Sequence, residues 1–474
     1  MTVKASCLKV KPAEIIIIAL LLTGMLLAAG PQGEGAAARE LNLAESIEIA
    51  LENNPGFKAS QEELRALQPT VDMAEAARFP SISLTTSYVR MGGDAEEIEF
   101  DLGIDELDDE LDDFLNEIFA EAFEPPDSIF QTEFTLQQPV FTFGRISRGI
   151  EQAEAAYQAG EAGFSGERQE LIHEVITTYH DVILSREMVD FQQDVREQVQ
   201  AHKDVVRTNL EAGLVTELDL HEARVALLEV EQELMEAESG LELAREGFRS
   251  LLGLERGTGI TLADSGEELL DELEEGAVNL AGAEDYLDLS DNPGLEQFHY
   301  QQEASEAGLN LAEAERFPVI SLMGNYSWED EDFGFEDSSW SLAVNVSLDI
   351  FDGGQRRAEI EQAEAELRQL EYVQEEMEDG LRLEAKRAIS SLQDARSRQE
   401  LAAERLAEAR SRVDLAELRY AEGVGTSTDV LNARTDKNQA RLAELQAEFS
   451  RIEAVADIYL VLGEADKLFE VVHQ

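Results

Sequence analysis

The chain has one cysteine, Cys7, among its 474 residues. It precedes an N-terminal apolar run and would leave with a cleaved leader. A disulfide framework, a thiol nucleophile and a cysteine-based metal site are then all excluded. Its position before the apolar run also differs from that of a lipoprotein cysteine.

Basic residues are scarce as well. The sequence holds 37 lysines and arginines against 101 aspartates and glutamates, which gives a formal net charge of −64. Such a surface repels nucleic acid and anionic headgroups, so nucleic acid is excluded as a partner. The acidic residues are spread over helix faces, linkers and loops, which fits an adaptation to high salt, where charge repulsion is screened.

Motifs of the common catalytic classes are missing. There is no glycine-rich phosphate loop with its lysine and no His-Glu-x-x-His zinc motif. His173 and His180 share a helix face, but no third ligand stands near them in the sequence. The sequence therefore predicts no enzyme activity, no catalytic residue, no cofactor and no metal site.

The N-terminus has the pattern of a secretory signal peptide over residues 1–38. Lys4, Lys9 and Lys11 precede an apolar run at residues 15–29, and Ala36-x-Ala38 is a plausible cleavage point. Glycines and a proline follow the run, which favours cleavage over a retained membrane anchor. After this leader, no apolar run is long enough for a spanning helix.

The remaining sequence is a tandem duplication. Segments in the first half return in the second at a spacing of 238 residues, and later segments return at 210, so the first copy carries an insertion of roughly 28 residues. The first repeat covers residues 39–261 and the second covers 286–474, with an acidic connector at 262–285. The recurring segments are 53–57 and 291–295, 78–80 and 316–318, 150–155 and 360–365, and 213–219 and 423–429.

Each repeat contains two long helices. Residues 145–212 and 355–422 lack proline and are rich in Ala, Glu, Gln, Leu and Arg, and a helix of this length reaches about 100 Å. Apolar residues recur at intervals of three and four, so each helix needs a packing partner. Return helices are predicted at 216–252 and 426–462, which gives two antiparallel coiled-coil hairpins.

Between the helices the periodicity changes to two. Strands are predicted at residues 80–90, 128–141, 318–328 and 338–351, with one apolar, aromatic face and one small, polar face. A soluble sandwich shares this alternation, but the aromatic strand ends and the export signal favour a membrane barrel. Four strands cannot close a membrane barrel, so it must be shared between subunits. The residues predicted to face lipid are Trp328, Trp340, Leu342, Val344, Val346 and Leu348.

Taken in order and twice over, these segments resemble the TolC family of outer-membrane efflux channels across nearly all of the mature chain. The segments that carry the resemblance are 53–57 and 291–295, Arg78-Phe79-Pro80, the glycine-ended segments 138–144 and 348–354, and the turns at 213–219 and 423–431. The resemblance implies a mainly helical protein in the outer membrane, whose long coiled-coil hairpins form a periplasmic tunnel. It further implies a homotrimer with a shared 12-stranded barrel, surrounded by outer-membrane lipid.

The function implied by the resemblance is passive passage through a tripartite efflux or type I secretion system. The implied partners are a periplasmic adaptor protein and an inner-membrane pump of the RND or the ABC class. A periplasmic structural or adaptor coiled-coil protein without a barrel is the alternative from another class. An adaptor needs one hairpin and soluble β-domains, whereas this chain has two hairpins and apolar strand faces.

The turns between the helices are the candidate functional site. Asp219 and Asp429 follow the two turns, where a ring of carboxylates would attract cations or, alternatively, where each would serve only as a helix-start carboxylate. Asn432 stands one turn further, where the family pattern often has a second aspartate. Tyr420 precedes the second turn and either latches it or packs as an ordinary tyrosine. Adaptor docking is predicted at Gly213, Leu214, Thr216, Gly423, Val424, Gly425 and Thr426.

One acidic insertion breaks the symmetry of the repeats. Residues 92–127 lie between two predicted strands and alternate acidic residues with apolar ones at helical spacing. They read as an external loop with a short amphipathic helix. Binding of a divalent cation is the alternative, but the spacing lacks the calcium-loop pattern and its glycine.

Overall fold

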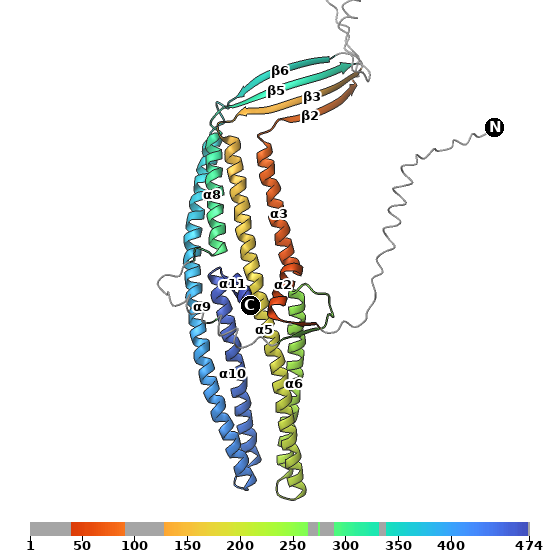
Figure 1. Cartoon of the computed structure of the whole chain (residues 1–474), viewed down its shortest axis with the longest axis vertical. Coiled ribbons are helices and arrows are strands. Elements are labelled where there is room, and N and C mark those ends of the chain that lie inside the picture. Colours follow the sequence, from red (N-terminus) through yellow and green to blue (C-terminus); the bar gives the residue numbers. More distant parts are fainter. Residues whose placement is uncertain (1–38, 91–127, 264–273, 275–288, 331–337, 473–474) are drawn as a thin grey trace, which may run out of the picture.

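The structure is a long bundle of helices with a four-stranded sheet across one end (Figure 1). This computed structural model describes residues 39–90, 128–263, 274, 289–330 and 338–472. The signal peptide, the acidic insertion and nearly all of the connector lie outside these residues. In chain order the elements are β1 (Arg39–Leu41), α2 (Leu43–Asn53), α3 (Pro55–Ala76), β2 (Ser81–Arg90), β3 (Ser128–Phe141), α5 (Arg145–Glu211), α6 (Glu217–Leu251), β4 (Ile260–Leu262), α8 (Pro293–Ala314), β5 (Val319–Asp330), β6 (Ser338–Ser347), α9 (Gln355–Ala421), α10 (Ser427–Val461) and α11 (Ala465–Val472).

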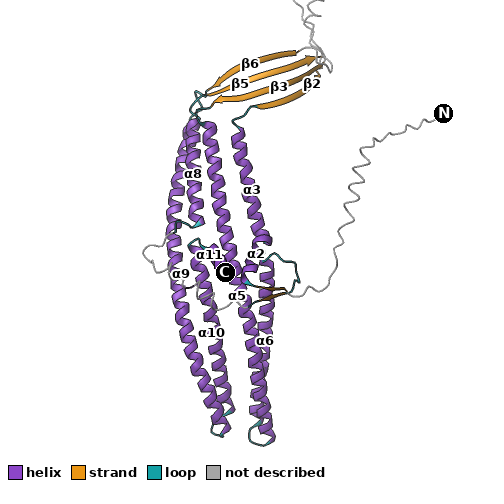
Figure 2. Cartoon of the chain, in the orientation of Figure 1, coloured by secondary structure: helices purple, strands orange, loops and turns teal. Residues whose placement is uncertain are grey.

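The duplication is visible in the lengths of the helices. α5 and α9 each have 67 residues, and α6 and α10 each have 35. Each long helix runs from the sheet to the far end of the molecule, where it turns back into its shorter partner (Figure 2). The shorter return helices stop near the middle, and α3 and α8 continue beside the long helices toward the sheet. Among the described helices, none combines the length and apolar character needed to cross a membrane.

The repeated Asn-Pro segments join the short helices to the return helices. Asn54 caps α3 by accepting from the amide of Phe57 at 2.9 Å, and its Nδ2 donates to the carbonyl of Leu251 at 2.9 Å. Asn292 does the same in the second copy, where its Nδ2 donates to the carbonyl of Val461 at 2.9 Å. In each copy, one asparagine therefore caps the start of one helix and donates a hydrogen bond to a carbonyl oxygen at the end of another.

The main core lies at the middle of the bundle. It packs α2, α5, α6, α9, α10 and α11 around the two-stranded parallel sheet of β1 and β4. Tyr179 is fully buried there, and its hydroxyl lies 3.2 Å from the carbonyl oxygen of Leu41 and 2.5 Å from that of Ala263. We call β1, β4, α2, α11 and the connector residue Glu274 the equatorial elements, because they gather at this level.

The four-stranded sheet is antiparallel, in the order β2-β3-β5-β6. Its register pairs Leu84 with Phe134, Phe134 with Tyr326, and Tyr326 with Trp340, so these residues share one face. Most of the large apolar residues of the four strands therefore lie on the same side, as the alternation predicts, while Val89, Ile129 and Met323 lie on the other. On the opposite side, Asn325 donates to Glu133 at 2.6 Å. β2 and β6 are edge strands within this chain.

The last strand is shorter than predicted. We expected it to reach residue 351, but β6 ends at Ser347, which pairs with Val319, the first residue of β5. Pro318 precedes Val319 and has no amide to donate, so nothing remains for Leu348 to pair with. Leu348 therefore lies just beyond the strand. β5 in turn extends to Asp330, two residues further than predicted.

Candidate gate and docking site at the hairpin tips

The first hairpin tip is built by a glycine turn and a capping box. α5 ends at Glu211, and Gly213 has a φ of +73°, which an L side chain rarely adopts. Thr216 then caps α6: its hydroxyl accepts from the amide of Asp219 at 3.3 Å, while the carboxylate of Asp219 accepts from the amide of Thr216 at 2.7 Å. Leu214, between Gly213 and Thr216 in the chain, has 74% of its surface exposed.

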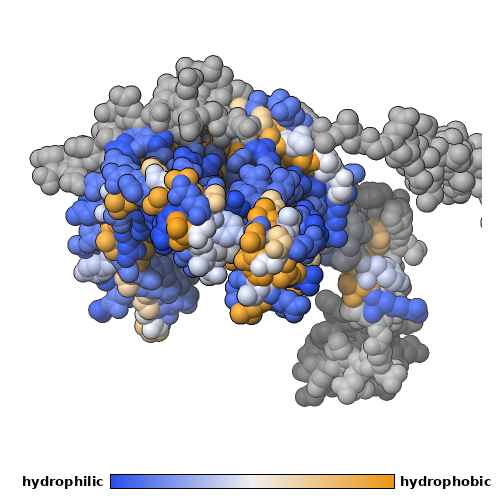
Figure 3. Space-filling model, turned by 90° about the horizontal axis from the view of Figure 1, so that it is seen from below, coloured by the Kyte–Doolittle hydropathy of each residue, from blue (hydrophilic) through white to orange (hydrophobic). Residues whose placement is uncertain are grey.

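The second tip repeats this geometry. Gly423 has a φ of +74°, and the amides of Val424 and Gly425 donate to the carbonyl of Arg419 at 3.0 and 2.9 Å. Thr426 accepts from the amide of Asp429 at 3.1 Å, and the carboxylate of Asp429 accepts from the amide of Thr426 at 2.9 Å. The predicted docking residues therefore lie in two matching turns. Figure 3 views the molecule from this end, where apolar patches interrupt a mostly hydrophilic surface.

Asp219 and Asp429 both serve as helix-start carboxylates. Hydrogen bonds from Thr216 hold the pKa of Asp219 below its usual value, and those from Thr426 do the same for Asp429. Both side chains therefore stay ionised at the tips, where Asp429 is exposed and Asp219 is half-buried. The cap role does not remove the negative charge, so it is compatible with the predicted attraction of cations. Asn432 is exposed one turn further along α10.

Tyr420 connects the two hairpins. Its hydroxyl accepts from Nδ2 of Asn209 at 3.0 Å, and its ring lies 6.4 Å from the ring of His202 on the same helix as Asn209. Burial is the main reason why the pKa of His202 is lowered. Tyr420 is thus a contact between α9 and α5 near the tips.

A second contact between the hairpins lies further from the tips. Arg434 pairs with Glu417 at 2.7 Å and donates to the carbonyl of Gln198 on α5 at 3.0 Å. Neither Asn209 nor Arg434 is identified as a site residue by the sequence, because no spacing within one repeat reveals a contact between repeats. We call the two contacts, Asn209 with Tyr420 and Arg434 with Gln198, the hairpin latch.

His173 and His180, the pair on α5 considered as metal ligands, bind different partners. Nε2 of His173 lies 2.8 Å from Asp457 on α10, and Nδ1 of His180 lies 2.7 Å from the carbonyl oxygen of Ile176. Burial lowers the pKa of His180 to about 4. In the part of the chain that is described, no group of three or more His, Cys, Asp or Glu side chains is placed to hold a metal ion.

The residues predicted to face lipid are mostly exposed in the single chain. Trp328 is the exception, because it packs edge-on against Phe134 and Tyr326, with ring centroids 5.9 and 4.6 Å away. Leu348 lies just beyond the end of β6. The other exposures are 75% for Trp340, 63% for Leu342, 69% for Val344, 60% for Val346 and 48% for Leu348.

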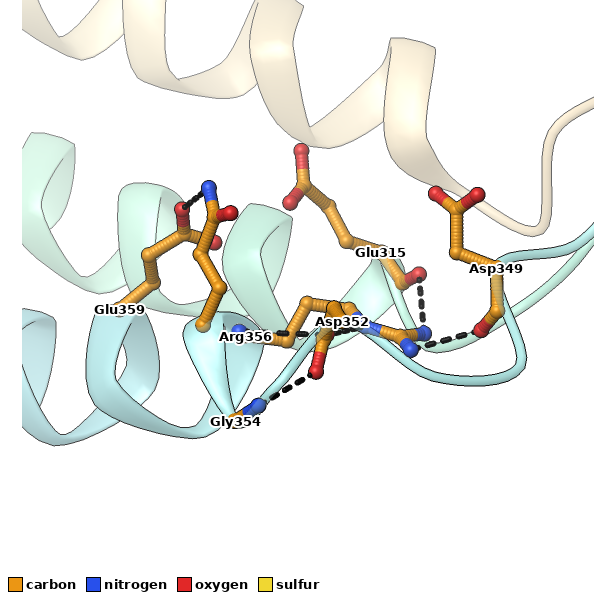
Figure 4. Close-up of polar contacts among 7 residues, drawn as sticks. Glu315, Asp349, Asp352, Gly354, Arg356 and Glu359 are labelled. Carbon is orange, nitrogen blue, oxygen red and sulfur yellow. Dashed lines mark hydrogen bonds and ion pairs between the residues drawn. The ribbon is translucent and has the colours of Figure 1, made fainter.

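A charged clamp lies in the second copy where the chain passes from β6 into α9, next to the end of α8 (Figure 4). Asp352 pairs with Arg356 and accepts from the amide of Gly354 at 2.9 Å. Arg356 also donates to the carbonyl oxygens of Asp349 at 2.6 Å and Glu315 at 3.5 Å. The hydrogen bond from Arg356 is the largest cause that lowers the pKa of Asp352 to about 2.

The duplicated positions in the first copy carry no charge. Thr142 stands where Asp352 stands in the second copy, and Ile146 stands where Arg356 stands. The hydroxyl of Thr142 accepts from the amide of Ile146 at 3.4 Å. The helix start is thus retained in both copies, while the ion pair is present in one.

The paired hairpins and the one-sided sheet correspond to a known family. The family model described as outer membrane efflux protein matches residues 46–254 and 286–464, which is most of the chain. The chain belongs to this family. Protein CyaE of Bordetella pertussis is 25% identical over 413 residues, which cover 85% of this chain and 80% of that protein. Outer membrane efflux protein BepC of Brucella suis is 22% identical over 454 residues, which cover 93% of this chain and 88% of that protein. The crystal structure of the Campylobacter jejuni CmeC outer membrane channel shares the fold with a TM-score of 0.73, at 14% identity over 98% of this chain and 94% of that one.

Membership of the family confirms the predicted fold class, location and function. The protein is an outer-membrane channel of a tripartite export system, with a helical tunnel in the periplasm and a strand contribution to a barrel. Proteins of this family are channels that work as trimers with an adaptor and an inner-membrane pump. The alternative of a periplasmic coiled-coil adaptor without a barrel is therefore wrong.

Proposed function

We propose that three copies of this chain close one barrel of 12 strands and one helical tunnel, through which cargo passes passively. The observation that carries this proposal is the sheet, which has four strands, two free edges and a single apolar face. Pairing β6 of one copy with β2 of the next removes both edges and leaves every backbone group satisfied in the membrane. The apolar residues then face lipid and the polar ones face water.

The tips provide the entrance in this proposal. Three copies present six tips in a ring, and this places three Asp429 carboxylates near one axis. The hairpin latch holds the second hairpin against α5 and so favours a narrow entrance. The exposed Leu214 and Val424 supply apolar contacts for the periplasmic adaptor. The inner-membrane partner is a pump of the RND or the ABC class, and that pump selects the cargo.

The mass of the detergent-extracted protein tests the proposal. We expect the full chain, expressed with its leader and extracted from the outer membrane, to have three times the mass of one chain after correction for detergent. Cleavage of the leader is read from the N-terminal residue of the same sample. A stable monomer that needs no detergent would overturn the shared barrel.

A further inference from the structure

A groove of about 620 Å³ lies between α5, α9 and α10, at the level of the equatorial core but on a different side. Leu401 and Phe449 contribute apolar surface to it. Arg398 and Arg405 line it from α9, while Asp181 and Glu453 line it from α5 and α10. We call it the wall groove. Its size is that of a site for a small molecule.

The direction in which the wall groove faces follows from helix geometry. Two residues that are two positions apart on an α-helix are rotated by about 200° around its axis, so their side chains point in nearly opposite directions. On α5, Tyr179 binds the segments of β1 and β4, whereas Asp181 lines the groove. The groove therefore lies on the side of α5 that faces away from the equatorial sheet.

Both helices of the second hairpin, α9 and α10, have the same orientation toward the groove. Arg396 and Arg451 both pair with Glu274 of the connector. Arg398 and Glu453, each two residues further along its helix, line the groove. All three helices thus turn one face to the equatorial elements and the opposite face to the groove. In the trimeric tunnel proposed above, with the equatorial elements around its outside, the groove faces the lumen; the inference rests on that proposal.

The charges of the groove are separated across it. Arg398 and Arg405 are seven residues apart, two turns along one face of α9, and neither makes an ion pair with any described residue. Asp181 and Glu453 stand on the other two helices. Burial is the largest cause that raises the pKa of each of these carboxyl groups, and for Glu453 the nearby Asp457 and Asp181 add to it. Both carboxylates would therefore gain from a cationic partner, as both guanidinium groups would from an anionic one.

We propose that the wall groove binds an elongated aromatic zwitterion on its way through the tunnel. The anionic end lies against Arg398 and Arg405, and the ammonium end lies against Asp181 and Glu453. The aromatic body covers Phe449 and Leu401. A molecule with one charge only leaves two groups of the opposite rim unmatched, so both ends are needed for binding.

Norfloxacin is a suitable probe, because it is fluorescent and carries a carboxylate and an ammonium at opposite ends of an aromatic body. Its binding to the full-length protein in detergent is measured by fluorescence anisotropy. The doubly substituted variants Arg398→Gln/Arg405→Gln and Asp181→Asn/Glu453→Gln should each weaken binding by about tenfold or more. The ethyl ester of norfloxacin, which lacks the anionic end, should bind the unchanged protein about as weakly as norfloxacin binds the arginine variant.

A matched control uses two other arginines of α9. Arg357 and Arg368 are exposed and pair with glutamates one turn away on the same helix, outside the groove. Arg357→Gln/Arg368→Gln should leave binding unchanged. Equal weakening by this control, or no weakening by the Asp181→Asn/Glu453→Gln variant, would overturn the zwitterion site. The mass of each sample separates the two proposals: a trimer that fails to bind norfloxacin overturns the groove alone, and a monomer overturns the shared tunnel.

Discussion

At the scale of single residues, the repeated motifs are explained by contacts between distant parts of the chain. The asparagines at positions 54 and 292 each form hydrogen bonds with two helices. The glycine that follows each return helix lies against the backbone at that asparagine. A Cβ at Gly253 would lie 2.4 Å from the carbonyl oxygen of Asn53, and one at Gly463 would lie 2.6 Å from that of Asp291. The close approach requires glycine at both sites.

Replacing Gly253 with alanine should therefore destabilise the equatorial core. Its φ is +66°, and the added methyl group meets backbone that cannot rotate away, so we expect the free energy of unfolding to fall by about 3 kcal/mol. The matched control is Gly257→Ala, where φ is +86° but nothing lies within 4 Å, with an expected loss of about 1 kcal/mol. Thermal unfolding followed by circular dichroism measures both. Equal losses would show that backbone conformation alone decides the cost.

The clamp between Asp352 and Arg356 makes a prediction about pH. The pKa of Asp352 is lowered to about 2 in the folded protein, from 3.8. A lowered pKa means that the ionised carboxylate stabilises the fold above pH 4, and that this contribution disappears as the pH falls from about 4 to about 2. Asp352→Asn should lower the melting temperature at pH 7, and the difference from the unchanged protein should shrink over that range.

The first copy supplies a control for this experiment. Thr142→Val removes the corresponding side-chain acceptor from the helix start but involves no ionisable group. Its effect on the melting temperature should not depend on pH. A difference between Asp352→Asn and the unchanged protein that stays constant down to pH 2 would show that the clamp does not act through its charge.

At the scale of elements, periodicity and turn chemistry predict most of the fold from the sequence. The long helices, both tips and the two faces of the sheet follow from patterns within about ten residues. The end of β6 does not, because it is decided by Pro318 at the start of a neighbouring strand. The hairpin latch is also hidden, since its partners come from different repeats, and so is the contact of Arg356 with the carbonyl oxygen of Glu315, which lies at the end of another helix.

The two faces of β6 can be separated by one pair of substitutions. Val344 lies on the apolar face and its neighbour Asn345 lies on the polar face. Val344→Arg should block assembly in the outer membrane, at a cost of roughly 2–4 kcal/mol near the middle of the bilayer. Asn345→Arg should be tolerated, because its side chain points to water in the proposed barrel. The measurement is the amount of trimer in the outer-membrane fraction, and equal damage by both would contradict the assigned faces.

At the scale of the whole molecule, the tips are the part of the described chain farthest from the sheet, and they carry exposed apolar side chains there. Leu214→Lys combined with Val424→Lys should reduce binding of the purified channel to its adaptor by about tenfold. Surface plasmon resonance measures this binding with the channel held in detergent. Leu243→Lys is the control, because Leu243 is 75% exposed on α6 but lies far along the helix from the tip. Equal reduction by the control would place docking elsewhere on the hairpins.

Closure and charge at the entrance should respond to different substitutions. Tyr420→Phe removes the acceptor for Asn209 and keeps the ring, so it should loosen the hairpin latch and raise the conductance of single channels in a planar bilayer. Asp429→Asn keeps an oxygen that accepts from the amide of Thr426 but removes the charge, so it should weaken block by multivalent cations without raising conductance. Asp219→Asn makes the same change at the first tip and shows which ring of carboxylates binds the cation. If cation block is unchanged in the Asp429 variant, that residue serves only to start α10, and the three carboxylates do not lie close enough to the axis to bind one ion together.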